Sequence, residues 1–160
     1  MPGAAPWIDI AQALQAGFAA GGVHLVLLPG EAKATLTKYR ARRHQLFLGQ
    51  WQPDYPDPQS NADAFAMAPD LGADAADKTL AWRNFWQDDS AARLAAAAAS
   101  DGDVGRRAAL LRALDDEVRA HGPYIFLFQT IEQAAHRKNV DGLVLGSSPA
   151  QTRYAGIAKE

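Results

Sequence analysis

The feature that most constrains the fold is an alternation of helix-like and strand-like segments in the first fifty residues. After Pro6, large apolar side chains recur at spacings of three and four, which predicts a helix with one buried face. The residues on that face are Trp7, Ile10, Leu14 and Phe18. The glycine pair at 21–22 predicts its end, because glycine readily adopts the left-handed conformation at which helices end.

A continuous apolar run follows from Val23 to Leu28 and is bounded by Pro29 and Gly30. Such a run is typical of a strand that is covered on both faces. A second helix is predicted over 31–43 and a second strand over 45–49. Because a helix between two strands is the usual crossover of a parallel sheet, this order predicts an α/β fold. The expected architecture is a single domain over 1–160, with a small, mainly parallel sheet flanked by helices.

The second half of the chain continues with clearer helix signals and one clear strand signal. Capping groups at 88–90 precede a helix over 91–99, and Asp101 or Asp103 can cap a longer helix that ends before Gly122-Pro123. The longer helix is predicted to turn Val104, Ala108, Leu111, Leu114 and Val118 inward. A strand is predicted over 124–128, with weaker strand signals over 131–135 and 143–145.

The segment from Gln50 to Asp77 is rich in proline and aspartate and holds neither helical nor strand periodicity. A stretch of this kind in a compact domain is usually functional or disordered. Its first part, 51–58, combines an indole, a phenol, two carboxylates and three prolines. A carboxylate beside aromatic faces suits a ligand ammonium group. The alternative is ordinary turn chemistry, in which aspartates bind nearby backbone amides, and the residues alone favour that interpretation.

The motif Trp-x-x-Asp-Tyr-x-Asp-Pro directly after an apolar run resembles the hallmark of a class of bacterial extracellular solute-binding proteins. This is the oligopeptide/dipeptide class, which serves ABC importers. The motif residues are Trp51, Asp54, Tyr55, Asp57 and Pro58. Further similar segments occur in the order of the class over nearly the whole chain, at 37–43, 80–84, 122–124 and 137–142.

The resemblance implies the C-terminal lobe of a bilobed, periplasmic-binding-protein-like (type II) fold, with ligand held between two lobes. It implies that Asp54 pairs with the free amino group of a bound peptide, and that Trp51 and Tyr55 contribute to the same pocket. It assigns Asp57 and Pro58 to shaping the loop. Some members carry an arginine three residues before the tryptophan, where this chain has Leu48.

Members of the class are several times longer and open with a signal peptide and an N-terminal lobe. Residues from about 137 to 160 resemble the segment that crosses back to that lobe. The expectation is therefore a truncated lobe that binds peptide weakly by itself and self-associates through exposed apolar surface. Its expected partners are a peptide or related small solute, the missing N-terminal lobe and, in the full-length context, the ABC permease. The resemblance implies a periplasmic location, whereas residues 1–6 show no secretory signal and indicate the cytoplasm for the chain as it stands.

Other functions were weighed against this one. A net charge of −2 disfavours nucleic-acid binding, although five basic groups at 38–44 could track phosphates. A solvated helix face explains that cluster better. A further alternative is a stand-alone α/β interaction domain without a transport function.

An enzymatic role is not expected. The four histidines have no metal-ligand spacing, and Ser147 and Ser148 lack a nucleophile elbow. Asp54 and Asp57 could form an acid–base pair, but aspartates three residues apart in a proline-rich loop are common. No cofactor, no metal and no cysteine chemistry are expected, the last because the chain has no cysteine.

Overall fold

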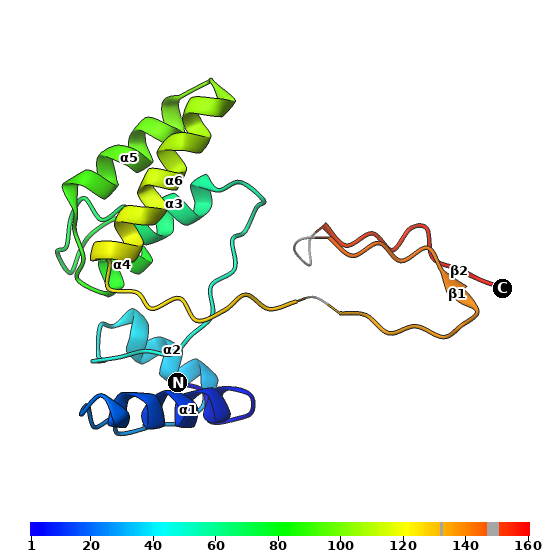
Figure 1. Ribbon diagram of the computed structural model, residues 1–160, viewed down its shortest axis with the longest axis horizontal. Helices are drawn as coiled ribbons and strands as arrows, with labels where there is room; N and C mark the ends of the chain where they lie inside the picture. Colours follow the sequence, from blue (N-terminus) through cyan, green and yellow to red (C-terminus); the bar gives the residue numbers. More distant parts are fainter. Residues whose placement is uncertain (132, 147–150) are drawn as a thin grey trace.

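The computed structural model describes residues 1–131, 133–146 and 151–160, and these form a helical body from which a hairpin arm extends (Figure 1). The helices are α1 (Trp7–Ala20), α2 (Ala32–Arg40), α3 (Gln59–Ala66), α4 (Leu80–Arg83), α5 (Asp89–Ser100) and α6 (Val104–His121). The strands are β1 (Val140–Asp141) and β2 (Ala158–Lys159). Helices α3 to α6 form one group, and α1 and α2 lie outside it (Figure 1).

The expected α/β fold, a small and mainly parallel sheet flanked by helices as in one lobe of a periplasmic binding protein, is wrong. Within the described ranges the sheet consists of β1 and β2 alone, paired antiparallel with Val140 opposite Lys159. The predicted strands at 23–28, 45–49 and 124–128 form no ladder, and neither do 131 and 133–135. Of the predicted segment 143–145, only Val144 is paired, in an isolated bridge to Arg153.

The physical reason for this difference is that an apolar run favours burial, whereas a strand also needs a backbone partner. Strands in a sheet lie about 4.8 Å apart and exchange hydrogen bonds along their length. In this structure the apolar runs join helices or lead to the arm, and none lies alongside another to form a ladder among the described residues. The strands predicted at these runs are therefore wrong, because an apolar run does not specify the segment with which it would pair.

The helices predicted near 7–20, 91–99 and 104–121 are confirmed, because their ends depend on local caps, whereas the one predicted over 31–43 ends at Arg40. Helices α3 and α4 were not predicted, and α3 lies inside the segment 50–77, which shows no periodicity in the sequence. Helix α1 begins after Pro6 and ends at Gly21, as the apolar spacing predicts. The Asp88 carboxylate accepts a hydrogen bond from the backbone N–H of Ala91 (2.8 Å) at the start of α5. Asp103, rather than Asp101, caps α6 in the same way. Val104 was predicted to face inward, but it is 83% exposed at the first position of α6.

The main core lies where α3, α5 and α6 meet, and small side chains dominate it. Ala91 and Ala95 on α5 are completely buried, and Leu114 and Val118 on α6 pack against them. Alanine favours the helix and allows close approach of neighbouring helices, but it buries little apolar area per residue. This core is therefore sensitive to added volume.

A second cluster surrounds Trp82 on α4 and connects the α2 region to the rest of the body. The guanidinium of Arg42 lies 3.3 Å from the centroid of the Trp82 ring and 4.0 Å from that of Phe85. Its Nη1 donates a hydrogen bond to the carbonyl oxygen of Leu71 (2.8 Å). Cation–π contacts of this kind hold the turn after α2 against α4.

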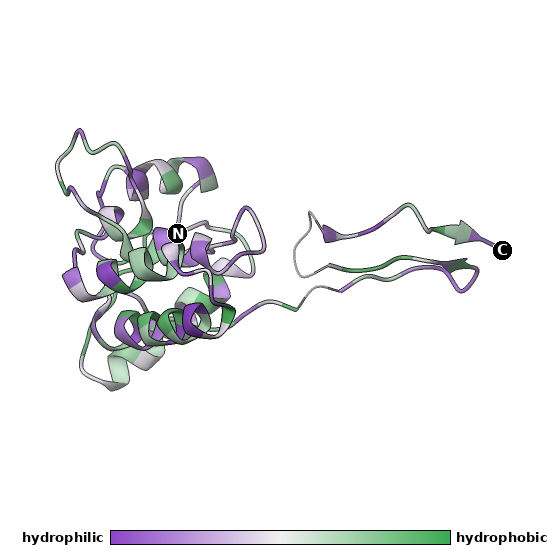
Figure 2. Ribbon diagram, turned by 90° about the horizontal axis from the view of Figure 1, so that it is seen from above, coloured by the Kyte–Doolittle hydropathy of each residue, from purple (hydrophilic) through white to green (hydrophobic). Residues whose placement is uncertain are grey.

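The arm consists of residues 133–146 and 151–160 and projects away from the helical body (Figure 2). Several apolar side chains on it, among them Val144, Tyr154 and Ile157, are exposed. In the part of the chain that the structure describes, no helix is both long enough and apolar enough to cross a membrane.

Candidate functional site

The loop at 51–58 is attached to the helical body through Asp57. Its Oδ1 accepts hydrogen bonds from the backbone N–H of Gln59 (2.7 Å) and from Nη2 of Arg107 on α6 (2.5 Å). The bond from Arg107 and the bond from Gln59 lower the pKa of the Asp57 carboxyl. Pro58 follows with a helical backbone (φ −56°) and leads directly into α3. The carboxylate of Asp57 is thus engaged in positioning the loop at the start of α3.

Trp51 stands at the beginning of the same loop and rests on α3. Its indole Nε1 donates a hydrogen bond to Oδ1 of Asn61 (2.9 Å), and its ring meets that of Phe65 edge to face at 5.9 Å. The side chain nevertheless stays 39% exposed. One part of the indole is therefore fixed by α3, and the rest is open to a ligand.

The predicted ligand-binding residues come together at one pocket of about 360 Å³. Such a volume falls within the usual range for small-molecule sites. It is lined by Trp51, Asp54, Tyr55, Ser60, Asp63, Ala64, Ala76, Asp77, Lys78, Thr79, Leu80 and Arg83. Asp57 and Pro58 are not among the described residues that line this pocket.

The pocket carries charges of both signs. Asp54, Asp63 and Asp77 contribute carboxylates, and Lys78 and Arg83 contribute cations. Among the described residues, no ion pair joins any of these carboxylates to either cation. Aromatic faces and unpaired carboxylates suit a ligand ammonium group, and the cations suit an anionic group.

Asp63, Asp77, Lys78 and Arg83 were not predicted as site residues. Arg83 belongs to the segment 80–84, which contributed to the resemblance but suggested no role. No spacing rule connects it to Asp54, because they are 29 residues apart in the sequence (83 − 54). Only the packing of the 76–80 segment and α4 beside α3 brings them to one pocket. Asp63 lies on α3 four residues after Gln59, which donates a hydrogen bond to it (2.8 Å), but no helical period in the sequence indicated this helix.

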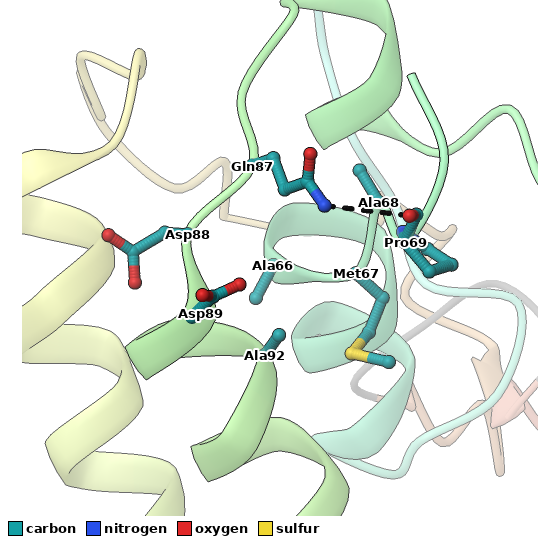
Figure 3. A pocket seen from close by; sticks show the side chains of 8 residues that line it. All are labelled: Ala66, Met67, Ala68, Pro69, Gln87, Asp88, Asp89 and Ala92. Atoms are coloured by element: carbon teal, nitrogen blue, oxygen red, sulfur yellow. Dashed lines mark hydrogen bonds between the residues drawn. The ribbon is translucent and has the colours of Figure 1, made fainter. Parts of the chain in front are cut away.

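A second pocket of about 250 Å³ lies between the end of α3 and the start of α5 (Figure 3). It is lined by Ala66, Met67, Ala68, Pro69, Gln87, Asp88, Asp89 and Ala92. One of its carboxylates, that of Asp88, already caps α5, and Gln87 donates to the carbonyl oxygen of Pro69 (3.5 Å). Because its lining holds no cation or aromatic ring, and no predicted site residue, the 360 Å³ pocket is the better candidate.

Two residues of the basic cluster at 38–44, which suggested nucleic-acid binding, pack against aromatic rings of the protein. Arg42 of the basic cluster is stacked on Trp82 and Phe85, and the ring of His44 packs against Tyr39 at 4.9 Å between centroids. Over the described ranges, no three His, Asp or Glu side chains are grouped so that they could hold a metal ion. Ser147 and Ser148 lie outside the described residues.

Comparison of the chain with protein-family models, with curated proteins and with solved structures gave no match. A functional assignment therefore depends on the residues of the pocket and on the sequence motif that they share.

Proposed function

We propose that this chain provides the ligand-binding site of the substrate-binding component of an ABC importer, and that it captures peptides or related amine-bearing solutes. The observation that supports this is the grouping of Trp51, Asp54 and Tyr55 at one pocket. These three residues belong to one sequence motif. A motif that served only as a turn would not need all three side chains to line the same pocket.

Asp54 is the proposed ammonium acceptor. Its carboxylate forms no hydrogen bond or ion pair with another described residue, in contrast to that of Asp57. The half-exposed rings of Trp51 and Tyr55 provide faces against which an ammonium group is stabilised. The nearby carboxylates of Asp63 and Asp77 increase the negative potential at the pocket.

The remaining parts of the proposal follow from the resemblance. The loaded receptor delivers its solute from the periplasm to an ABC permease. An open pocket on one body buries only part of a ligand, so binding by this chain alone is expected to be weak. A test must therefore detect millimolar affinities.

A titration followed by NMR meets this requirement. The ¹⁵N-labelled chain is titrated with trialanine and with N-acetyltrialanine, which lacks the ammonium group, and the indole N–H signal of Trp51 is followed. We expect trialanine to bind at least tenfold more tightly. Asp54→Asn should weaken trialanine binding by about 1.5–3 kcal/mol, the usual worth of a hydrogen bond to a charged group.

Asp116→Asn, on the exposed face of α6, is the matched control because it removes the same charge away from the pocket. Equal affinities of the Asp54→Asn variant and the unchanged chain for trialanine would refute the assignment. So would equal affinities of the unchanged chain for the two peptides.

A further inference from the structure

We infer that Arg83 recognises a carboxylate of the ligand, so that the captured solute is zwitterionic. This inference rests on the proposed function, because it places a second recognition group in the pocket of Asp54. The sequence motif provides only the acidic half of such a site. Arg83 comes from α4, outside the motif at 51–58.

The backbone that carries Arg83 is well fixed. Its N–H donates to the carbonyl oxygen of Thr79 (3.0 Å), and the Thr79 hydroxyl caps the helix by accepting from the N–H of Trp82 (3.1 Å). Trp82 is buried, and its indole donates to the carbonyl oxygen of Gly72 (2.9 Å). The backbone at Arg83 is therefore held in place beside the pocket, which lowers the entropy cost of ordering this residue on binding.

The charge of Arg83 is not neutralised by the protein. The side chain is half-buried, yet its Nε is buried without a hydrogen-bond acceptor among the described residues. The guanidinium lies over the Tyr39 ring, with its central carbon 5.6 Å from the ring centroid. Burial lowers the pKa of Arg83, which shows the same loss of solvation. A ligand does not reach the covered Nε, but Nη1 and Nη2 are neither covered in this way nor hydrogen-bonded to a described residue, so these two nitrogens can bind an acceptor in the pocket.

Three other arginines of the chain have a carboxylate partner, in contrast to Arg83. Arg106 pairs with Asp101 (3.0 Å), Arg119 pairs with Asp115 (2.7 Å) and Arg107 binds Asp57. Arg42 also has unpaired nitrogens, but it is covered by two rings and does not line the pocket. Arg83 shares a pocket with three carboxylates and forms an ion pair with none of them.

Ser60 adds a second unsatisfied group at the same place. Its hydroxyl oxygen is buried without a hydrogen-bond partner in the described part of the chain, and the residue lines the pocket. A ligand carboxylate offers two oxygens, which match the forked donors of a guanidinium. Because the Ser60 oxygen is itself covered, the ligand carboxylate contacts the guanidinium and not this hydroxyl. The pocket therefore presents an acidic and aromatic half for an amine and a basic half for a carboxylate.

Four probes separate the two halves. Trialanine carries both charges, and its C-terminal amide carries the amine alone. N-acetyltrialanine carries the carboxylate alone, and N-acetyltrialanine amide carries neither charge. Each is titrated by NMR into the unchanged chain and into the Arg83→Gln, Lys78→Gln and Asp54→Asn variants. Lys78→Gln is the matched control, because it removes the other cation of the pocket.

We expect the unchanged chain to bind trialanine more tightly than its amide by a factor on the order of tenfold to a hundredfold, the usual worth of a charge-assisted hydrogen bond. Arg83→Gln should abolish this preference and keep the dependence on the amine, whereas Lys78→Gln should leave most of it. Equal binding of trialanine and its amide, with the effect of Asp54→Asn intact, would overturn the role of Arg83 and leave the proposed function standing. Loss of the preference in Lys78→Gln rather than Arg83→Gln would also overturn it.

If no probe binds, the proposed function and the role of Arg83 fall together. Should Arg83→Gln not fold, as judged by its thermal melt, the Nε–Hε signal of Arg83 in the unchanged chain decides the matter. That signal should shift on titration with N-acetylalanine, which carries a carboxylate and no amine. A signal that stays in place would overturn the inference.

Discussion

Arg107 on α6 and Asp57 in the loop at 51–58 are joined by an ion pair of 2.5 Å, although they are fifty positions apart in the sequence. The same carboxylate oxygen accepts from the backbone of Gln59 at the start of α3. The Asp57 side chain therefore links the loop both to the start of α3 and to α6. Trp51, Asp54 and Tyr55 are on this loop, so the ion pair restricts the position of the proposed site.

The first prediction concerns the pH dependence of this link. Arg107 and the Gln59 amide lower the pKa of Asp57 in the folded state. The ionised carboxylate thus contributes stability that is present above its ordinary pKa of about 3.9 and is lost as the pH falls through the lower folded value. Thermal melts of the unchanged chain and of Asp57→Asn should differ at pH 7 and converge towards pH 2. Asp116→Asn is the control, and a constant difference over this pH range would contradict the prediction.

The second prediction concerns the alanine-rich core. Ala95 on α5 is completely buried, and its cluster includes Leu114 on α6. Replacing Ala95 by Leu adds volume where the helices are already in contact, and should destabilise the protein by about 1–3 kcal/mol. Ala97→Leu makes the same chemical change on the exposed face of the same helix and should have little effect. Urea denaturation of both variants measures the difference. Equal stabilities would show that α5 and α6 are not packed as described.

The third prediction concerns the phenol of Tyr124, which donates a hydrogen bond to the carbonyl oxygen of Phe65 (3.2 Å). Tyr124→Phe should lower the free energy of unfolding by about 0.5–1.5 kcal/mol at neutral pH. Burial raises the pKa of this phenol, so its stability contribution is complete below the ordinary pKa of about 10 and declines as the pH rises above it. Denaturation at pH 7 to 11 should show a steeper alkaline loss for the unchanged chain than for Tyr124→Phe. Identical slopes would contradict the role of burial.

The fourth prediction concerns self-association through the extended segment 124–128. Ile125 and Phe128 are 69% and 66% exposed, and the backbone of this segment belongs to no ladder among the described residues. Unpaired extended backbone with apolar side chains favours association between chains. Light scattering should show a mass that increases with concentration, and Ile125→Lys combined with Phe128→Lys should suppress that increase. Val104→Lys, at an isolated exposed position on α6, should not. A monomer at every concentration would contradict the prediction.

The comparison of sequence and structure differs between helices and strands. The caps at Asp88 and Asp103 and the stop at Gly21 were predictable, because each acts within a few residues. The strands predicted from the apolar runs at 23–28 and 124–128 do not form, because an apolar run does not specify the segment with which it would pair. The motif at 51–58 suggested the acidic and aromatic half of the pocket. The proposed role of Arg83 depends on the packing that brings α4 and the loop at 51–58 to the same pocket.

The sequence by itself determined the limits of α1, the caps of α5 and α6, and which loop carries an indole, a phenol and two carboxylates. These features depend on backbone conformation and on hydrogen bonds that span a few residues. The tertiary structure alone decided that the apolar runs do not form a parallel sheet. It also decided that Arg107 holds Asp57, and that Arg83 shares a pocket with Asp54. Each of these depends on contacts between residues far apart in the chain, and local periodicity carries no information about such partners.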